Sequence, residues 1–443
     1  MNQSSLLGSI FQCQCGRQHK VPTKRLHFSD NALSFLDETI SSLGNHNSIL
    51  VVADQRTIEV AGRDVVRMLN EASYEVDIHI VPDDQDESPV ADDLTKDSLM
   101  DRAPQADLYI AVGSGVVNDL VKWAAYLREK PYLVVATAAS MNGYASANVA
   151  ATIDGLKVLF HAQACQAVFA CPEVIINAPH ELTTSGLGDV LAKSVSSADW
   201  KLNQFLFDDY YCQFSVDLLK DLEPVYLNNP QKIRNKDPEA YQALFEALFY
   251  SSIAMTITGT SSPASGGEHL ISHTIDMLAG RDFRKHDLHG RQVGVASILM
   301  AALYEKIMGI EEPKFCEVPE NIDLGFWGTL AKVVQPEYRK KLPKIKQAAS
   351  FLSVPKNWEN LRSLIKPKLI EASKLKNCLL KAEAAHRYSD IRDNDESLKH
   401  SKFLEVVNHA NQMRERFTIL DLAVMLGIIP NQIEQLIEEW VTG

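Results

Sequence analysis

Apolar residues recur along the first half of the chain in short β-branched runs, and amphipathic segments separate these runs. Residues 57–70 follow the first run and have the spacing of a helix. Strands that alternate with helices favour a parallel sheet of the nucleotide-binding type. The pattern predicts four such strands, at residues 47–53, 74–82, 106–115 and 131–140.

The pattern changes after the fourth predicted strand. Residues 141–179 are β-rich and are expected to complete the first domain, and Pro179 with the polar loop after it marks a boundary. Beyond this loop, helical spacing continues to the C-terminus. We therefore predict an α/β dinucleotide-binding domain over residues 1–180 and an all-α domain over residues 181–443.

Composition and charge restrict the partners that such a chain can have. The chain has 443 residues, of which 46% are hydrophobic, so it can build two cores. The net charge is −13 and the basic residues form no stripe, which argues against nucleic acid or an anionic membrane surface as a partner. No apolar run reaches the roughly 18 residues of a membrane span, and no signal peptide is evident. We expect a soluble cytoplasmic protein that acts on a small molecule.

The cysteines do not suggest a disulfide framework. There are seven, an odd number scattered through a large chain. Cys13 and Cys15 form a C-x-C pair, but no second cysteine pair lies at zinc-ribbon spacing. The pattern therefore favours reduced thiols in a terminal β-turn over a structural metal.

A glycine-rich turn joins the third predicted strand to the helix that follows it. Gly113, Ser114 and Gly115 form this turn, where backbone N–H groups at the start of a helix can approach a phosphate. The dinucleotide fingerprint G-x-G-x-x-G is incomplete, since residue 118 is Asn. A tight turn without a ligand is the alternative interpretation.

Polar residues also end two other predicted strands. Thr137 and Ser140 follow the fourth strand, at the edge where parallel sheets bind ligands. Asp54 ends the first strand and could accept a hydrogen bond from a ribose hydroxyl. A role as a helix N-cap is equally compatible with its position.

The second half of the chain contains imidazole and carboxylate groups that could meet at a metal. His269 and His273 are spaced i, i+4 on one helix, and His289 begins the next helix. Asp189 lies near the start of an earlier helix. One carboxylate and two imidazoles suit a divalent cation and leave a position open for a substrate oxygen. Each residue taken alone could instead be a surface, core or helix-dipole residue.

Six segments along nearly the whole chain have a distinctive sequence, namely GSGVVNDLVKWAA, VVATAASMNGYAS, GLGDVLAKSVSSADWKL, ASGGEHLISH, LHGRQVGVA and RERFTILDLAVMLGI. They resemble segments of sn-glycerol-1-phosphate dehydrogenases, especially of the bacterial branch of that family. The resemblance implies the architecture of dehydroquinate synthase and the iron-containing alcohol dehydrogenases, in which an α/β nucleotide-binding domain precedes an α-helical domain and the active site lies between them.

The resemblance also implies roles for individual residues. It implies that Asp189, His269 and His289 bind the metal, and that His273 is a second active-site histidine. It implies cofactor contacts from the glycine-rich turn and from Asp119, Thr137 and Ser140. We expect Asp54, because it ends the first strand, and Asn118 at the same site. Lys157, or less favourably Arg281, could neutralise a substrate phosphate, on the grounds of charge and position alone.

One position departs from the family pattern. Asn142 stands where the family has an Asp beside the substrate hydroxyls, and an amide can hydrogen-bond there but cannot act as a base. The resemblance implies NAD(P)- and metal-dependent interconversion of dihydroxyacetone phosphate and sn-glycerol 1-phosphate, by a homodimer. The alternatives are a glycerol or polyol dehydrogenase, a cyclase like dehydroquinate synthase, and a binding or regulatory module that retains the cleft without the chemistry, which Asn142 favours. The sequence does not choose among zinc, nickel and iron, or between NAD and NADP.

Overall fold

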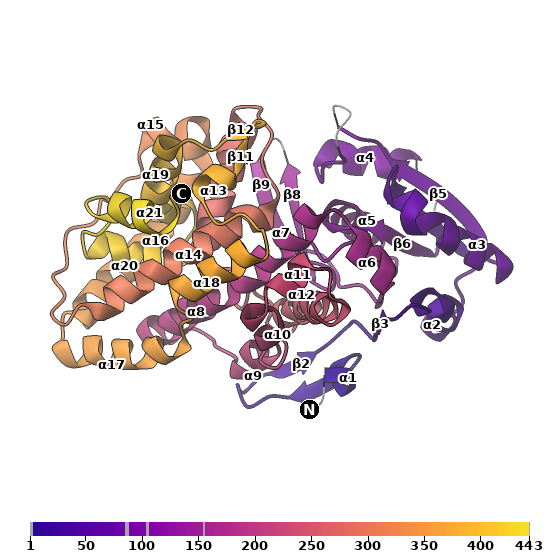
Figure 1. The fold of residues 1–443 in the computed structure, drawn as a ribbon, viewed down its shortest axis with the longest axis horizontal. Helices are drawn as coiled ribbons and strands as arrows, with labels where there is room; N and C mark the ends of the chain where they lie inside the picture. The colour runs from indigo at the N-terminus through magenta and orange to yellow at the C-terminus, as the bar shows by residue number, and fades with distance from the viewer. Residues whose placement is uncertain (1–2, 85–87, 103–105, 154–155, 443) are drawn as a thin grey trace. The chain divides into compact units, whose positions relative to one another are not determined.

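The computed structural model describes residues 3–84, 88–102, 106–153 and 156–442, and the chain divides into two compact units (Figure 1). The first unit comprises Met1–Gly186, Asp217–Tyr226 and Lys232–Thr260, and the second comprises Leu187–Val216, Leu227–Gln231 and Ser261–Gly443. This division differs from the boundary expected at residue 180. Helix α12 (Pro238–Thr258) belongs to the first unit because it packs against α6 (Pro172–Asn177) and β2 (Gln18–Lys20).

A six-stranded parallel sheet forms the centre of the first unit. The strands lie in the order β3-β10-β7-β6-β4-β5, and each neighbouring pair is parallel. Their bounds are β3 Arg25–Phe28, β4 Ser48–Asp54, β5 Glu75–Val81, β6 Leu108–Gly113, β7 Tyr132–Ala136 and β10 Ala167–Ala170.

The inner strands β4, β6 and β7 are buried on both faces, which explains why they are almost entirely apolar, whereas the edge strand β5 is largely exposed. Ile49, Val51 and Ala53 of β4 point to one face, where they pack with residues of α2 (Leu36–Leu43) and α3 (Arg63–Glu71). The opposite face is covered by α5 (Gly115–Leu127), which contacts β4, β6 and β7. Leu50 and Val52 face that side because successive residues of a strand alternate.

The four strands predicted from the sequence correspond to β4, β5, β6 and β7. The predicted helix at residues 57–70 is divided into a π-helical turn, Ile58–Gly62, and α3. Residues 141–179 contain β10 and α6 as well as an antiparallel pair, β8 (Asn148–Ile153) and β9 (Leu156–His161). The remaining elements of the first unit are α1 (Gln3–Leu6), β1 (Ile10–Gln12), the 3₁₀ helix Ala32–Phe35 and α4 (Asp93–Arg102).

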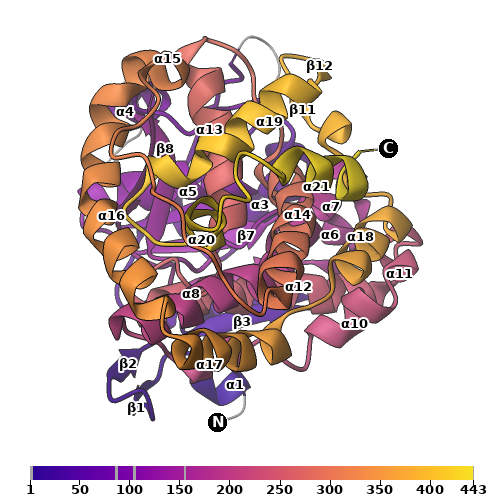
Figure 2. The same ribbon diagram turned by 90° about the vertical axis from the view of Figure 1, so that its left-hand side faces the viewer.

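The described part of the second unit is mainly helical, with α14 (His289–Gly309) in contact with α13 (Gly267–Arg281), α18 (Ala372–Lys381), α20 (Ile419–Met425) and α21 (Ile433–Trp440) (Figure 2). Its other helices are α8 (Lys193–Phe207), α15 (Leu324–Trp327), α16 (Ala331–Leu352), α17 (Pro355–Ile365) and α19 (His400–His409), and β11 (Arg392–Asp393) pairs with β12 (Glu396–Ser397). Helices α7 (His180–Leu191), α9 (Gln213–Asp217), α10 (Glu223–Asn228) and α11 (Gln231–Arg234) each include a change from one unit to the other.

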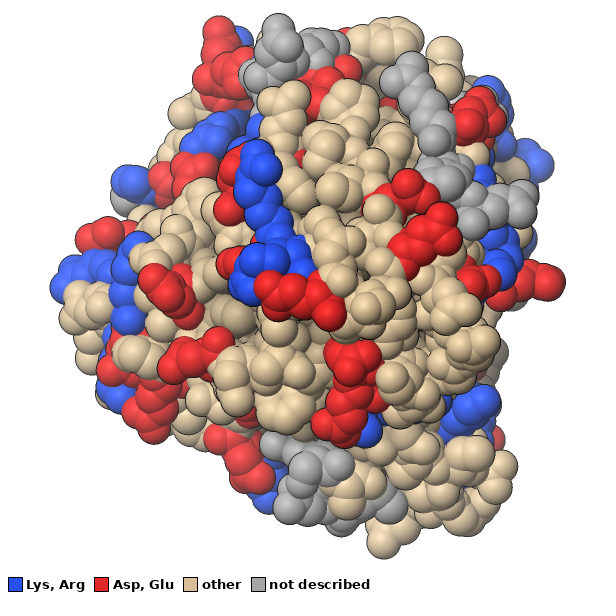
Figure 3. Space-filling view, turned by 90° about the vertical axis from the view of Figure 1, so that its right-hand side faces the viewer, with Lys and Arg blue, Asp and Glu red and all other residues tan. Residues whose placement is uncertain are grey.

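Basic and acidic side chains lie beside one another on the face seen from the α3 side (Figure 3). On α3, Arg67 pairs with Asp64 at 3.0 Å and with Glu71 at 3.2 Å. Opposite charges so close together largely cancel each other's field at a distance. Among the described residues, no helix has the length and apolar character needed to cross a membrane.

Candidate functional site

Helices α7 and α14 approach each other closely because glycines face one another. A Cβ added at Gly188 of α7 would lie 2.0 Å from Gly290 O and 3.2 Å from Gly294 Cα of α14. Only residues without a side chain allow the two backbones to come so near. As a result Asp189, the residue after Gly188, lies beside His289, the first residue of α14.

Asp189, His269 and His289 come together from α7, α13 and α14. One ligand-type atom of each residue lies within 4.8 Å of those of the other two. His269 Nε2 is 3.5 Å from Asp189 Oδ1, and the two imidazole centroids are 5.0 Å apart. The sequence therefore identified three residues that meet at one point.

The hydrogen bonds of His289 fix which of its nitrogens carries the proton. Ser272 Oγ donates its one proton to Gln292 Oε1 at 2.7 Å, and Gln292 Nε2 in turn donates to Asp276. Ser272 Oγ must therefore accept from His289 Nδ1, which is 2.9 Å away. This leaves the lone pair of His289 on Nε2, the tautomer that a metal ligand needs.

His269 is oriented in the same way by a buried carboxylate. Its Nδ1 donates to Glu268 Oε1 at 2.8 Å, which directs Nε2 toward Asp189. Burial by itself lowers the pKa of His269, but the hydrogen bonds and charges of Asp189 and Glu268 outweigh this and raise the pKa to about 9. Two carboxylates at this point thus favour a positive charge, and a divalent cation would satisfy the same field.

His273 lies one helical turn after His269, and its ring is close to both other imidazoles. The ring centroid of His273 is 5.7 Å from that of His269 and 5.4 Å from that of His289, with the latter pair stacked. His273 is partly exposed, whereas His269 is buried. A third imidazole beside a cation site is suitably placed for proton exchange.

In the first unit, the glycine-rich turn lies at the point where the order of strands reverses. Strands β4 and β6 are neighbours, although β5 comes between them in the chain. In open α/β sheets, ligands bind outside the carboxyl ends of the strands at such a switch point. Gly113 ends β6 there, and a Cβ on it would lie 2.7 Å from Val117 Cβ. Ser114 is the N-cap residue of α5, whose N-terminus therefore borders the switch point.

The other residues expected at the cofactor lie at the same edge of the sheet. Asp54 ends β4, and its Oδ1 accepts from the backbone N–H groups of Arg56 and Thr57 at 2.8 and 2.9 Å. This is the capping role that the sequence left open beside a ribose contact. Thr137 and Ser140 follow β7 and are both buried.

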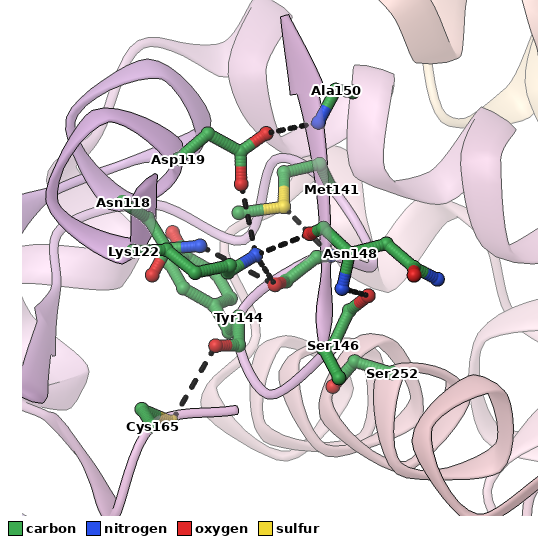
Figure 4. A network of polar contacts seen from close by, with 12 residues as sticks. Asn118, Asp119, Lys122, Met141, Tyr144, Ser146, Asn148, Ala150, Cys165 and Ser252 are labelled. Carbon is green, nitrogen blue, oxygen red and sulfur yellow. Dashed lines mark hydrogen bonds and ion pairs between the residues drawn. The ribbon is translucent and has the colours of Figure 1, made fainter. Parts of the chain in front are cut away.

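Asn118 and Asp119 take part in a buried network around a lysine (Figure 4). Lys122 Nζ donates to Asp119 Oδ1 at 2.9 Å, to Gly143 O at 3.0 Å and to Asn148 O at 2.8 Å. Asn118 Nδ2 also donates to Gly143 O, at 3.3 Å. Lys122 is fully buried, so its ammonium group is held by these acceptors rather than by water.

The segment with Asn142 is also held from its other side, by α12. Ser252 Oγ accepts from Ala145 N at 3.0 Å, and Thr256 Oγ1 donates to Ala145 O at 2.9 Å and accepts from Ala147 N at 3.0 Å. Together with the bonds from Lys122, these contacts fix the backbone on the C-terminal side of Asn142. The loop that carries Asn142 is therefore anchored by both α5 and α12.

Lys157 and Arg281 are the two residues that could contact a substrate phosphate. Lys157 belongs to β9, but its side chain lies outside the described part of the structure. Arg281 ends α13, where its guanidinium donates to Phe326 O at 2.7 Å and pairs with Asp282 at 2.7 Å. These contacts engage Arg281 within the second unit.

Several residues of the site were not predicted from the sequence. Glu268 directly precedes the proposed ligand His269 and holds its Nδ1, and Ser272 lies on the same helix and holds the Nδ1 of His289. Both could have been found by asking which residue bonds the Nδ1 of each proposed ligand. Lys122 follows Asp119 by three residues on a helix, a spacing that indicates a pair. Asp199, on α8, accepts a hydrogen bond from Gly267 N at 2.7 Å, and no local sequence pattern indicates that contact.

Comparisons with known proteins agree with the geometry. Residues 27–179 match the family model described as iron-containing alcohol dehydrogenase. The chain is 30% identical to a glycerol-1-phosphate dehydrogenase [NAD(P)+] of Halalkalibacterium halodurans, over 92% of this chain and 94% of the relative. A second relative of that name, from Pyrococcus furiosus, is 33% identical over 62% of this chain and 76% of its own length.

Solved structures show the same fold. Glycerol dehydrogenase from Schizosaccharomyces pombe matches with a TM-score of 0.57 and 16% identity, covering 94% of this chain and 91% of that chain. Sulfoacetaldehyde reductase from Bifidobacterium kashiwanohense, solved in complex with NAD+, matches with a TM-score of 0.58 and 13% identity, covering 95% and 97%. The fold expected from the resemblance, that of the iron-containing alcohol dehydrogenases, is thereby confirmed. From the identity that extends over nearly all of both sequences, the chain belongs to the glycerol-1-phosphate dehydrogenase family.

Proposed function

We propose that this chain is an NAD(P)- and metal-dependent oxidoreductase that interconverts dihydroxyacetone phosphate and sn-glycerol 1-phosphate. The relatives that match most of its length carry the name glycerol-1-phosphate dehydrogenase [NAD(P)+]. The observation on this chain that carries the proposal is the cluster of Asp189, His269 and His289, in which hydrogen bonds at both Nδ1 atoms leave Nε2 for a cation. A module that only bound a nucleotide would have no use for this cluster.

Asp189, His269 and His289 are the proposed ligands of one divalent cation. Their donor set suits zinc, nickel and ferrous iron alike. The cation, when bound, supplies a Lewis acid for the oxygen at C2 of the substrate. Glu268 and Ser272 keep the two imidazoles in the ligand orientation, a role that supports the affinity for the cation.

His273 is the proposed site of proton exchange with the C2 hydroxyl, directly or through a water. Its ring neighbours both ligand imidazoles and is partly exposed, so it can reach a substrate and solvent. Asn142 would orient the substrate hydroxyls through its amide, from the loop that Lys122 and α12 fix. Lys157 is the proposed partner of the substrate phosphate.

The dinucleotide is proposed to bind at the switch point of the sheet, with its pyrophosphate at Gly113–Gly115 and the N-terminus of α5. The cofactor gives or accepts the hydride. Asn118, Asp119, Thr137 and Ser140 are the further residues proposed to shape its site. Asp54, the last residue of β4, would disfavour a 2′-phosphate if the ribose lies beside it, so NAD is the first cofactor to test.

The test is oxidation of the reduced cofactor by full-length protein that has been stripped with a chelator and reloaded with zinc, nickel or iron. We expect NADH or NADPH oxidation with dihydroxyacetone phosphate only in a reloaded sample. The reverse reaction should accept sn-glycerol 1-phosphate and reject sn-glycerol 3-phosphate.

Three results would change the assignment. Turnover of dihydroxyacetone but not of its phosphate would make the protein a polyol dehydrogenase. Cofactor that stays bound without net consumption while another substrate is cyclised would support the dehydroquinate synthase-like alternative. Cofactor binding without turnover of any ketone would reject an oxidoreductase. The homodimer and the cytoplasmic location expected from the sequence stay predictions.

A further inference from the structure

The N-terminal hairpin of the first unit brings two cysteines and a histidine together. Strands β1 and β2 pair in register, and the loop between them begins at Cys13. Gly16 N donates to Cys13 O at 3.1 Å and Cys13 N donates to Arg17 O at 2.9 Å, which closes a tight turn. Gly16 has φ of +83°, a left-handed conformation that favours glycine at this position of a hairpin. Cys13 and Cys15 therefore both lie in one tight turn.

His19, on β2, is oriented toward these sulfurs from the protein interior. Only 1% of its surface is exposed. Its Nδ1 donates to Ile257 O, near the end of α12, at 2.8 Å, because a carbonyl oxygen can only accept. The lone pair is therefore on Nε2, and this atom lies 3.3 Å from Cys15 Sγ. The Phe11 ring packs against the imidazole in an edge-to-face arrangement, with the centroids 5.4 Å apart.

We propose that Cys13, Cys15 and His19 bind a structural zinc ion, separate from the cation of the Asp189 cluster. The ligand-type atoms of the three residues lie within 4.8 Å of one another. In a tetrahedral zinc site, a thiolate at about 2.3 Å and an imidazole nitrogen at about 2.1 Å are roughly 3.6 Å apart, close to the observed separation of Cys15 Sγ and His19 Nε2. The bond from His19 to Ile257 O is the outer contact that zinc-binding imidazoles commonly make.

The sequence alone favoured reduced thiols in this turn, and a thiol that donates to an imidazole would account for Cys15 and His19. It would not account for the second sulfur, that of Cys13, which lies within 4.8 Å of Cys15 Sγ and of a ring nitrogen of His19. A soft cation does, because thiolates and imidazole are its preferred ligands. Through His19 the zinc would fasten the hairpin to the end of α12, two parts of the first unit that are far apart in sequence.

The experiment uses cobalt as a spectroscopic probe in full-length protein. The protein is stripped of metal, reloaded with Co²⁺, and examined for the near-ultraviolet charge-transfer absorption that only a thiolate–cobalt bond gives. We expect this band in the wild-type protein, with zinc displacing the cobalt. The band should remain in His289→Ala, whose change lies in the other proposed metal site, which contains no sulfur.

Variants of the hairpin complete the test. Cys13→Ser and Cys15→Ser should lose the band and one equivalent of zinc per chain, while Cys171→Ser, a change at another partly buried cysteine of the first unit, should keep both. Absence of the band in folded wild-type protein would overturn the proposal, even if a variant could not be purified. A band that survived both hairpin substitutions would overturn it too. Neither outcome bears on ketone turnover, so this proposal and the proposed function fail separately.

Discussion

Asp199 is a fully buried carboxyl group of α8 that three donors surround. Tyr304 Oη and Ile419 N donate to its Oδ1 at 2.6 and 2.8 Å, and Gly267 N donates to its Oδ2 at 2.7 Å. Desolvation, followed by the charge of Glu268, raises the pKa of Asp199 to about 7 against these hydrogen bonds. Asp199 therefore holds a proton in the folded protein at a pH where the unfolded chain has released it.

This pKa predicts a pH dependence of stability. Between about pH 4 and pH 7 the folded state binds one more proton at Asp199 than the unfolded state, so the free energy of unfolding falls as the pH rises. A difference of one between the pKa of Asp199 in the folded and the unfolded state corresponds to roughly 1.4 kcal/mol in the free energy of unfolding. Asp199→Asn cannot titrate, and urea unfolding across this range should show a shallower fall for the variant than for the wild type.

Asp323 provides the matched control. It caps α15 and accepts from Phe326 N at 2.9 Å, and this hydrogen bond, with smaller contributions from His409, lowers its pKa. Asp323→Asn should keep the wild-type slope between pH 4 and pH 7, because a lowered pKa affects stability only at more acidic pH. Parallel slopes for the wild type and Asp199→Asn would contradict the assignment.

At the scale of residues, the sequence indicated the proposed metal ligands but not the residues that hold neighbouring side chains and backbone in place. Asp189, His269 and His289 were identified because imidazoles and carboxylates at helix positions suggest a cation, and the structure brings them together. Asp199 and Lys122 could not be assigned a place, since buried charges depend on partners that only the tertiary structure supplies.

At the scale of elements, strands with strong apolar patterns were predictable and weakly patterned ones were not. Strand β4 is continuously apolar, whereas β3, RLHF, has two basic-type residues among four and joins the sheet only through β10. The position of α12 in the first unit was also missed, because its helical spacing says nothing of the element that it packs against. Local sequence spacing can predict that a helix forms, but it does not show which other elements that helix packs against.

The contact of α7 with α14 gives a prediction about these two helices. Gly188→Ala would place a Cβ 2.0 Å from Gly290 O, so the helices must separate. We expect a loss of about 1–3 kcal/mol in the free energy of unfolding. Because Asp189 and His289 move apart with the helices, we also expect at least about ten-fold weaker metal binding, measured by competition with a chromophoric chelator.

Gly309→Ala is the control on the same helix. Gly309 is the last residue of α14, and a Cβ on it would meet no described atom within 4 Å. This variant should bind metal as the wild type does and unfold at a similar or slightly higher temperature. Wild-type stability and metal affinity in Gly188→Ala would show that the glycine is not required for the approach.

At the scale of the whole molecule, the proposed cofactor site and the proposed metal site belong to different units. His289→Ala should lose the metal at the Asp189 cluster, as elemental analysis would show, and still quench NADH fluorescence on binding with a Kd near that of the wild type. Gly113–Gly115, the turn proposed to hold the pyrophosphate, belongs to the first unit, whereas His289 begins α14 of the second unit.

A variant of the proposed cofactor site tests the same independence from the other side. Gly113→Ala would place a Cβ 2.7 Å from Val117 Cβ and distort the turn before α5. It should weaken NADH binding and retain the metal of the second unit. Loss of both ligands in either variant would show that the two sites do not form independently.

The first unit is discontinuous in sequence, and this affects how the protein can be made. Ser252 and Thr256 of α12, which bond the backbone at Ala145 and Ala147, are more than a hundred positions downstream of it. On the ribosome, the loop at residues 145–147 can therefore be anchored to α12 only after intervening chain of the second unit has emerged. A recombinant fragment that stopped at Gly186 would lack these tethers, so expression of the nucleotide-binding half alone calls for a graft of α12 as well.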